Sequence, residues 1–224
     1  MNSRKKIIVS WSGGKDSTLA LYNIVKDEKF EVSALLTVIT EDYDRVSMHG
    51  IRRIMLEKQV EYLGYFLEKI FIPKNASDKE YKSQMVSTLQ KYLLHGIRSI
   101  IFGDIFLEDV RKYREENLSK IDMTALFPLW KKDTFQLAKE FIKLGFKSVI
   151  TCVDSKSLSK NFVGRVFDKE FLTALPSNVD PMGENGEFHS FVYDGPLFKR
   201  RVKFELGDIV LRDGRFYFCD LIPL

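Results

Sequence analysis

The chain has 224 residues, which is enough for one large domain or for a medium domain and a small one. Apolar residues make up 45% and charged residues 29%, as in ordinary soluble proteins, and the formal net charge of +4 permits a polyanionic partner without requiring one. No apolar run approaches the roughly 18 residues of a membrane span, and Ser10 and Ser12 interrupt the apolar stretch after the basic N-terminus, so we expect a cytoplasmic protein without a membrane span or signal peptide.

Apolar runs and helix-period patterns alternate along the first two thirds of the chain. Strands are predicted over residues 4–10, 32–40, 66–72, 99–102 and 148–153, and helices over residues 16–28, 48–63, 79–94, 107–118 and 132–144. Such alternation predicts a parallel sheet, and ligands bind parallel sheets at the carboxyl ends of the strands. The glycine-rich residues 12–17 and 103–104 follow the first and fourth predicted strands, so we expect them to share one cleft.

The composition changes after about residue 155. Glycine, proline and asparagine become frequent, short β-rich segments follow, and Asp213-Gly214 between two such segments is typical of a hairpin turn. We therefore predict a smaller α/β unit at the C-terminal end, with domains over residues 1–150 and 151–224. Cys152 and Cys219 match no metal or redox spacing, so we expect two buried free thiols.

The predicted turn between the first strand and the first helix reads SGGKDS and comprises Ser12, Gly13, Gly14, Lys15, Asp16 and Ser17. Glycines let backbone N–H groups approach phosphate oxygens, a helix N-terminus favours negative charge, and the serines and the lysine add donors. The spacing fits neither a Walker P-loop nor the G-x-G-x-x-G fingerprint. An acidic residue beside a phosphate-binding lysine suggests that Asp16 holds Mg²⁺ against a phosphate. The alternative is a tight turn with a serine cap and no ligand.

SGGKDS resembles the pyrophosphatase loop, or PP-loop, of the adenine nucleotide alpha-hydrolase superfamily. Enzymes of that superfamily cleave ATP between the α and β phosphates and transfer AMP to a substrate oxygen, from which a nucleophile displaces it. The resemblance implies an α/β fold with a parallel-sheet, HUP-like (Rossmann-like) nucleotide-binding domain, in which residues 12–17 grip the pyrophosphate of ATP. Positive charge and N–H donors would then stabilise the leaving pyrophosphate.

A second polar cluster lies within DPMGENGEFHSF at residues 180–191, where two glycines beside polar side chains suggest a required backbone shape. We interpret it as a site that binds a polar or cationic group and positions a nucleophile. Glu184 or Glu187 would act as a general base or hold ammonium, Asn185 would orient an acyl carbonyl, and His189 would move protons near neutral pH. No nitrogen-donor domain is visible, which favours free ammonia as the nitrogen source. The alternative is a polar Asn-Gly turn.

GENGEFHS resembles the signature of the diphthine–ammonia ligase family, also called the diphthamide synthase ATP-binding domain family. Ordered matches extend over nearly the whole chain: SGGKDS, His49 before a helix, Phe102-Gly103-Asp104-Ile105, Pro128-Leu129-Trp130, Gly164-Arg165 and Gly195-Pro196-Leu197-Phe198. The resemblance implies that Gly103 and Asp104 line the nucleotide cleft and that Glu184 to His189 belong to the substrate side of the site.

The same resemblance implies an ATP-dependent, AMP-forming amide ligase with a smaller C-terminal α/β substrate domain. A substrate carboxylate would be adenylated, pyrophosphate would leave, and ammonia would give the amide. In the family the product is diphthamide on elongation factor 2. Diphthamide is made in eukaryotes and archaea, so a bacterial chain would act on a related acceptor that carries a carboxylate.

Two other functions stay open, namely a PP-loop enzyme that modifies tRNA and a non-catalytic ATP-binding protein. No basic tract with interleaved aromatic residues marks an RNA groove apart from the short Lys199-Arg200-Arg201, which we interpret as a solvated loop, so a nucleic-acid partner is not expected. Simple nucleotide binding would not need the second polar cluster. The sequence is compatible with a homodimer and does not determine the oligomeric state.

Overall fold

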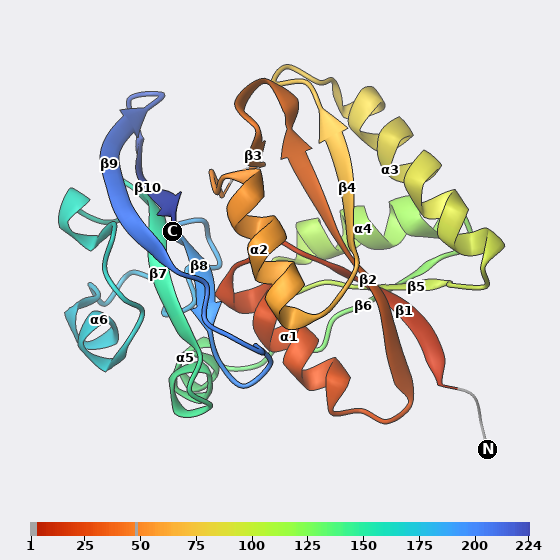
Figure 1. Cartoon of the computed structure of the whole chain (residues 1–224), viewed down its shortest axis with the longest axis horizontal. Coiled ribbons are helices and arrows are strands. Elements are labelled where there is room, and N and C mark those ends of the chain that lie inside the picture. Colours follow the sequence, from red (N-terminus) through yellow and green to blue (C-terminus); the bar gives the residue numbers. More distant parts are fainter. Residues whose placement is uncertain (1–3, 48) are drawn as a thin grey trace.

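The computed structural model describes residues 4–47 and 49–224. Its larger sheet is mostly parallel, with the order β4-β2-β1-β5-β6 and a short strand, β3, antiparallel to the end of β2 (Figure 1). The strands are β1 (Lys5–Ser10), β2 (Phe30–Thr40), β3 (Arg45–Val46), β4 (Leu67–Ile72), β5 (Ser99–Ile101) and β6 (Thr124–Leu126). This sheet confirms the parallel α/β arrangement that the alternating pattern predicts.

One predicted strand belongs to a different sheet. The sequence pattern assigns residues 148–153 to the parallel sheet, but they form most of β7 (Lys147–Asp154), which pairs with β8 and β10 in a second, antiparallel sheet. The fifth parallel strand is β6 instead. The pattern misses β6 because three residues are too few to show a period.

Helices cover both faces of the larger sheet, with α1 and α2 on the face toward the second sheet and α3 and α4 on the other (Figure 1). Side chains along β1 alternate accordingly, because Ile7 and Val9 pack with α1 and α2 whereas Ile8 packs with α3 and α4. The helices are α1 (Lys15–Val25), α2 (Arg53–Leu63), α3 (Asp78–Leu94), α4 (Glu108–Ser119), α5 (Thr134–Lys143) and α6 (Lys169–Ala174), with 3₁₀ turns at Glu41–Tyr43 and Lys160–Phe162.

The helix predicted over residues 48–63 begins only at Arg53. Gly50 has a φ of +70°, a left-handed conformation that a right-handed helix cannot include, so the chain makes a loop before α2. Residue 48, at which the predicted helix starts, lies outside the described residues. Because α2 starts later, His49 lies before the helix and lines the cavity at the carboxyl ends of the strands.

The second sheet has the order β8-β7-β10-β9 and is antiparallel throughout. Its other strands are β8 (Phe188–Asp194), β9 (Phe204–Arg212) and β10 (Phe216–Pro223). The predicted hairpin joins β9 and β10, and Asp213 and Gly214 in its turn have φ values of 51° and 60°. A chain of ring contacts through Phe141, Phe167, Phe171 and Phe188 packs α5 and α6 against this sheet.

The two sheets share one continuous core. Buried side chains from β1, α1 and α2 form a single cluster with those of α5, α6, β7 and β8, and Figure 1 shows α1 and α2 between the two sheets. The backbone N–H of Val192 in β8 donates to the carbonyl of Gly13 over 2.9 Å. The proposed division at residue 150 falls inside β7 and stays a prediction. None of the described helices is long and apolar enough to cross a membrane.

Candidate functional site

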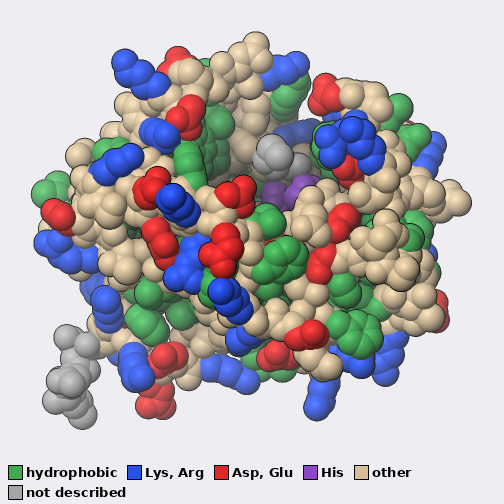
Figure 2. Space-filling model, turned by 180° about the vertical axis from the view of Figure 1, so that it is seen from behind, with side chains coloured by type: hydrophobic (Ala, Val, Ile, Leu, Met, Phe, Trp, Pro, Cys, Tyr) green, Lys and Arg blue, Asp and Glu red, His purple; other side chains and the backbone are tan. Residues whose placement is uncertain are grey.

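A cavity of about 610 Å³ opens where the carboxyl ends of β1, β2 and β5 meet the loop before β8. Both predicted glycine-rich segments contribute to its wall, so the expected shared cleft is present. Seven of the predicted site residues line it: Ser12, Asp16, Ser17, Gly103, Asp104, Glu184 and His189. Figure 2 shows this hollow from behind, with histidine side chains deep inside it.

The turn at residues 12–17 is held open for an anion by its own hydrogen bonds. The Ser12 hydroxyl accepts from the N–H of Gly14 over 3.3 Å and lies 3.2 Å from the Ser17 hydroxyl. Gly14 caps α1, and no side chain bonds to this first turn as a helix cap. The Lys15 N–H donates to the Ser190 hydroxyl and the Ser17 hydroxyl donates to the Gly14 carbonyl, whereas the N–H groups of Asp16 and Ser17 have no acceptor among the described residues. Phosphate binding by this turn stays a prediction.

Lys15 and Asp16 form a partly buried ion pair at the start of α1. The Lys15 ammonium is 3.1 Å from Asp16 Oδ2 and 4.9 Å from the centre of the Phe188 ring, and the lysine is only 2% exposed. Burial raises the pKa of Asp16 although Lys15 opposes the shift. Asp16 Oδ1 is buried and has no hydrogen-bond partner among the described residues, so this oxygen is free to bind a ligand.

The donor set at Asp16 suits Mg²⁺ bound together with a phosphate. No group of three or more histidine, cysteine, aspartate or glutamate side chains in the described chain is arranged to hold a metal by itself. Mg²⁺ commonly takes one or two carboxylates, substrate phosphates and water instead of an all-protein cage. The free Oδ1 of Asp16, in the turn at residues 12–17 that is predicted to bind phosphate, fits that mode of binding.

Gly103 allows the segment after β5 to contact the turn at residues 12–17 closely. A Cβ atom at this position would lie 2.8 Å from the carbonyl carbon of Asp16 and 2.9 Å from the nitrogen of Ser17. The next residue, Asp104, pairs with Arg114 of α4, whose Nε is 2.7 Å from Asp104 Oδ2. The Arg114 guanidinium also stacks 4.2 Å from the centre of the Phe102 ring. Asp104 is thereby fixed by a cation that the sequence analysis does not identify.

Glu184 connects the loop before β8 to the segment that follows β5. Its Oε1 accepts from the N–H of Ile105 over 2.7 Å. Burial raises the pKa of Glu184 to about 7, the bond from Ile105 opposes this shift, and the nearby carboxylates of Asp16 and Asp104 add to it. Of the two glutamates proposed as a base, Glu184 is the one that faces the cavity.

Glu187 and Asn185 point into their own loop. The buried carboxylate of Glu187 accepts from the backbone N–H groups of Asp180 and Asn185, each over 3.0 Å, and from the Asn185 side chain over 2.9 Å. Neither residue is among those that line the cavity. The contacts support a role in shaping the loop, and a direct chemical role for either residue stays a prediction.

Replacing Glu184 by glutamine is expected to raise the stability of the protein at pH 8 relative to the wild type, with little difference at pH 4. Because the folded-state pKa lies above the ordinary value, the wild type loses stability as the pH rises from about 4.5 to 7. Glutamine stays neutral, and its amide oxygen still accepts from Ile105. Urea unfolding of both proteins at the two pH values measures the difference, and Glu31→Gln on exposed β2 surface is the control. An equal effect at both pH values would contradict the prediction.

Two imidazoles meet on the wall of the cavity. The ring centres of His49 and His189 are 4.5 Å apart, and both residues line the cavity. Burial and the Lys15 ammonium lower the pKa of His189 to about 4, and burial, His189 and Lys15 lower the pKa of His49 well below its ordinary value. With these lowered pKa values, both rings are neutral at neutral pH. His49 Nδ1 is buried without a hydrogen-bond partner among the described residues, so this nitrogen is free for a ligand.

The sequence analysis misses several residues of the cavity wall. Thr37 comes from the carboxyl end of β2, Tyr81 and Met85 from α3, and Arg114 from α4. The rule that parallel sheets bind ligands at their carboxyl ends could have found Thr37, because β2 neighbours β1. The helical residues carry no local signal, since they look like ordinary members of amphipathic helices.

The two cysteines take no part in this cavity. Cys152 and Cys219 are free and buried, as predicted. Burial raises the pKa of the Cys152 thiol to about 12, so this thiol is protonated and unreactive at neutral pH.

Comparisons with known proteins agree with this geometry. The sequence matches the family models for the diphthamide synthase N-terminal domain over residues 5–124 and for the diphthamide synthase C-terminal domain over residues 133–218. A diphthine–ammonia ligase of Schizosaccharomyces pombe is 26% identical over 217 residues, which cover 88% of this chain and 36% of that protein.

Two vertebrate proteins of the same name are also similar. The diphthine–ammonia ligase of Homo sapiens is 28% identical over 124 residues, covering 53% of this chain and 46% of the relative, and that of Danio rerio is 23% identical over 163 residues, covering 70% and 63%. The matches to these three relatives thus span 36% to 63% of their lengths. Since the two domain models together extend from residue 5 to residue 218, the chain belongs to the diphthamide synthase family.

Proposed function

We propose that this protein is an ATP-dependent, AMP-forming ligase that adenylates a carboxylate and converts it to an amide with ammonia. The observation that carries the proposal is that the phosphate-binding turn and the polar loop before β8 face each other across one cavity. A nucleotide phosphate and a second substrate can therefore meet without a large rearrangement. The names of the relatives, diphthine–ammonia ligase, agree with this reaction class.

The pyrophosphate end of ATP would lie on the turn at residues 12–17. Backbone N–H groups of the start of α1, the hydroxyls of Ser12 and Ser17, and the Lys15 ammonium would bind the β and γ phosphates. Mg²⁺ held by Asp16 would neutralise charge on the phosphates. Catalysis at this end would be electrostatic, because these donors favour the separation of pyrophosphate from the α phosphate.

The amine and the acceptor would enter from the side of the loop before β8. Glu184 has a pKa near 7, which suits it to exchange a proton with the attacking amine at neutral pH. The neutral rings of His49 and His189 would accept hydrogen bonds from ammonia or its protonated form. Glu187 and Asn185 would hold this loop in shape through the hydrogen bond between their side chains. The acceptor is proposed to be a protein that carries diphthine, such as elongation factor 2, or a related carboxylate.

The nucleotide product tests the proposal. The protein is incubated with ATP, Mg²⁺, ammonium and candidate acceptors, including elongation factor 2 that bears diphthine, and we expect AMP and pyrophosphate in proportion to the amide formed. An ATP analogue with a methylene bridge between the α and β phosphates should bind and inhibit, whereas the β,γ-methylene analogue should still support the reaction. ADP and phosphate as products would overturn the proposal.

A further inference from the structure

The second sheet ends in a long strand with one free edge. β9 pairs with β10 and, among the described strands, with no other. It has nine residues, so the free edge is about 30 Å long. The outward N–H and C=O groups of such an edge are a template for a further strand.

This edge lacks two of the usual protections against strand pairing, proline and short length, although it carries charged residues and the bulge opposite Asp220. Short length, proline and inward-pointing charge normally keep edge strands apart. β9 contains no proline, and its apolar side chains are exposed to an unusual degree, with Leu206 at 53%, Ile209 at 38%, Val210 at 40% and Leu211 at 50%. Exposed apolar side chains gathered on one strand in this way mark an interaction surface.

The register between β9 and β10 assigns the side chains of β9 to two faces. Leu206, Ile209 and Leu211 pair with Leu221, Cys219 and Tyr217, so these apolar residues share one face across the bulge near Asp220. Glu205, Val210 and Arg212 pair with Ile222, Phe218 and Phe216 and share the other face. An acidic and a basic residue therefore lie on the same face, at opposite ends of the strand.

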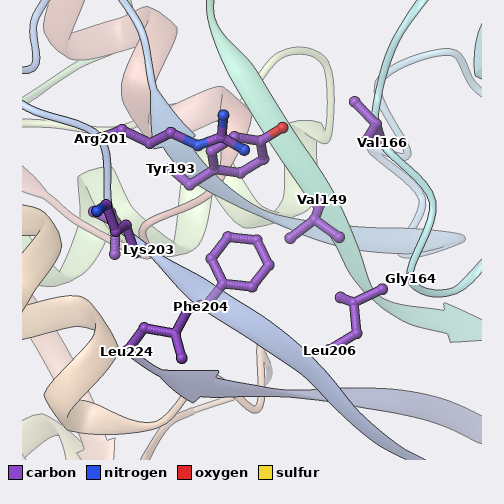
Figure 3. Close-up of a pocket in the computed structure, with 10 residues that line it drawn as sticks. Val149, Gly164, Val166, Tyr193, Arg201, Lys203, Phe204, Leu206 and Leu224 are labelled. Carbon is purple, nitrogen blue, oxygen red and sulfur yellow. The ribbon is translucent and has the colours of Figure 1, made fainter.

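The apolar face of β9 continues into a hollow of about 380 Å³. Figure 3 shows Leu206, Phe204 and Leu224 on one side of this hollow and Val149 and Val166 opposite them. Leu224 is itself 62% exposed. The free edge and the hollow thus form one apolar surface, and no residue of β9 lines the larger cavity at residues 12–17.

We propose that two copies of this chain associate through antiparallel pairing of their β9 strands. With one bulged residue at Gly207-Asp208 of each strand, a twofold axis at Ile209 places Glu205 of each copy opposite Arg212 of the second copy, and Leu206 opposite Leu211. Glu205 and Arg212 lie on one face of the strand, and Leu206 and Leu211 lie on the other. Both pairs therefore satisfy the requirement that cross-strand neighbours share a face. Leu211 of the second copy then packs at the mouth of the hollow that Leu206 lines.

The charges favour a second copy over an unrelated strand. Neither Glu205 nor Arg212 forms an ion pair within the described chain. Twofold pairing gives each a partner of opposite charge, so the edge is complementary to itself, as an isologous interface requires. The larger cavities of both copies stay open to substrates, because their walls contain no residue of β9.

Charge reversal and its rescue test this interface. Sedimentation equilibrium of the full chain should show a dimer, and Glu205→Arg or Arg212→Glu should each raise the dissociation constant about tenfold or more, because like charges then face each other twice per dimer. The double variant Glu205→Arg with Arg212→Glu should restore the wild-type constant. Lys79→Glu, an exposed residue of α3, is the control for net charge.

The double variant also separates the interface from the fold, because it contains both substitutions and should still dimerise. A wild-type protein that stays monomeric at about 100 μM would overturn the proposal. A dimer whose dissociation constant is the same in both single variants and in the Lys79→Glu control would overturn it as well, since association would then use another surface.

Discussion

Replacing Lys15 by methionine is expected to slow the release of pyrophosphate from ATP about a hundredfold to a thousandfold, the usual cost of removing one donor that stabilises developing charge. Methionine keeps most of the buried volume but removes the ammonium that lies 3.1 Å from Asp16 at the start of α1. The loss should appear in the rate of a single turnover at saturating ATP, because the charge on pyrophosphate develops as the bond to the α phosphate breaks.

The Lys15→Met protein also leaves the Asp16 carboxyl without its partner, so the fold must be checked by thermal unfolding. The double variant with Asp16→Asn removes the unpaired acid and should recover stability but not activity. Lys26→Met at the other end of α1 is the matched control, because its ammonium lies over the Tyr22 ring at 4.2 Å and away from the cavity. A wild-type rate for Lys15→Met would remove this residue from the proposed mechanism.

Replacing Gly103 by alanine is expected to weaken ATP binding at least tenfold and to lower the free energy of unfolding by about 1–3 kcal/mol, as overpacking usually does. The added Cβ would lie 2.8 Å from the carbonyl carbon of Asp16 and 2.9 Å from the Ser17 nitrogen. Both neighbours are backbone atoms, so the start of α1 must move away from β5. Calorimetric titration with ATP and urea unfolding measure the two effects.

Gly96→Ala serves as the comparison. An alanine Cβ at this exposed position meets no atom within 4 Å, but the φ of +75° costs about 1 kcal/mol for a residue with a side chain. This variant should lose stability and keep the wild-type affinity for ATP. If Gly103→Ala also kept that affinity, the contact between residues 103 and 16–17 would not shape the nucleotide site.

Local chemistry explains why part of the site was predictable. SGGKDS lies at the turn after β1, where the strand, the glycines and the helix start are all visible within one short segment. The topology rule then brings Gly103 and Asp104 to the same cleft, because β5 is the direct neighbour of β1. The dense polar cluster at Glu184 to His189 is conspicuous by composition alone.

Other features depend on tertiary contacts that leave no mark in the sequence. Gln59 looks like a surface residue of α2, yet it is fully buried, accepts from the Trp11 indole over 2.9 Å and donates to the carbonyl of Gly13 over 2.9 Å. Glu187 reads like a base, and only the structure shows that its carboxylate organises its own loop. Which sheet β7 joins also depends on a distant partner, because β7 pairs with β10, more than 60 residues later in the chain.

The bonds that join the phosphate-binding turn to β8 have a consequence for synthesis of the chain. Val192 donates to the carbonyl of Gly13, and Ser190 accepts from the N–H of Lys15, a contact between residues 175 positions apart. The turn is thus completed only after residues 190–192 have left the ribosome. A nascent chain that has formed β1 to β6 would still lack these two restraints, so tight ATP binding is expected to be a late event in the folding of this segment.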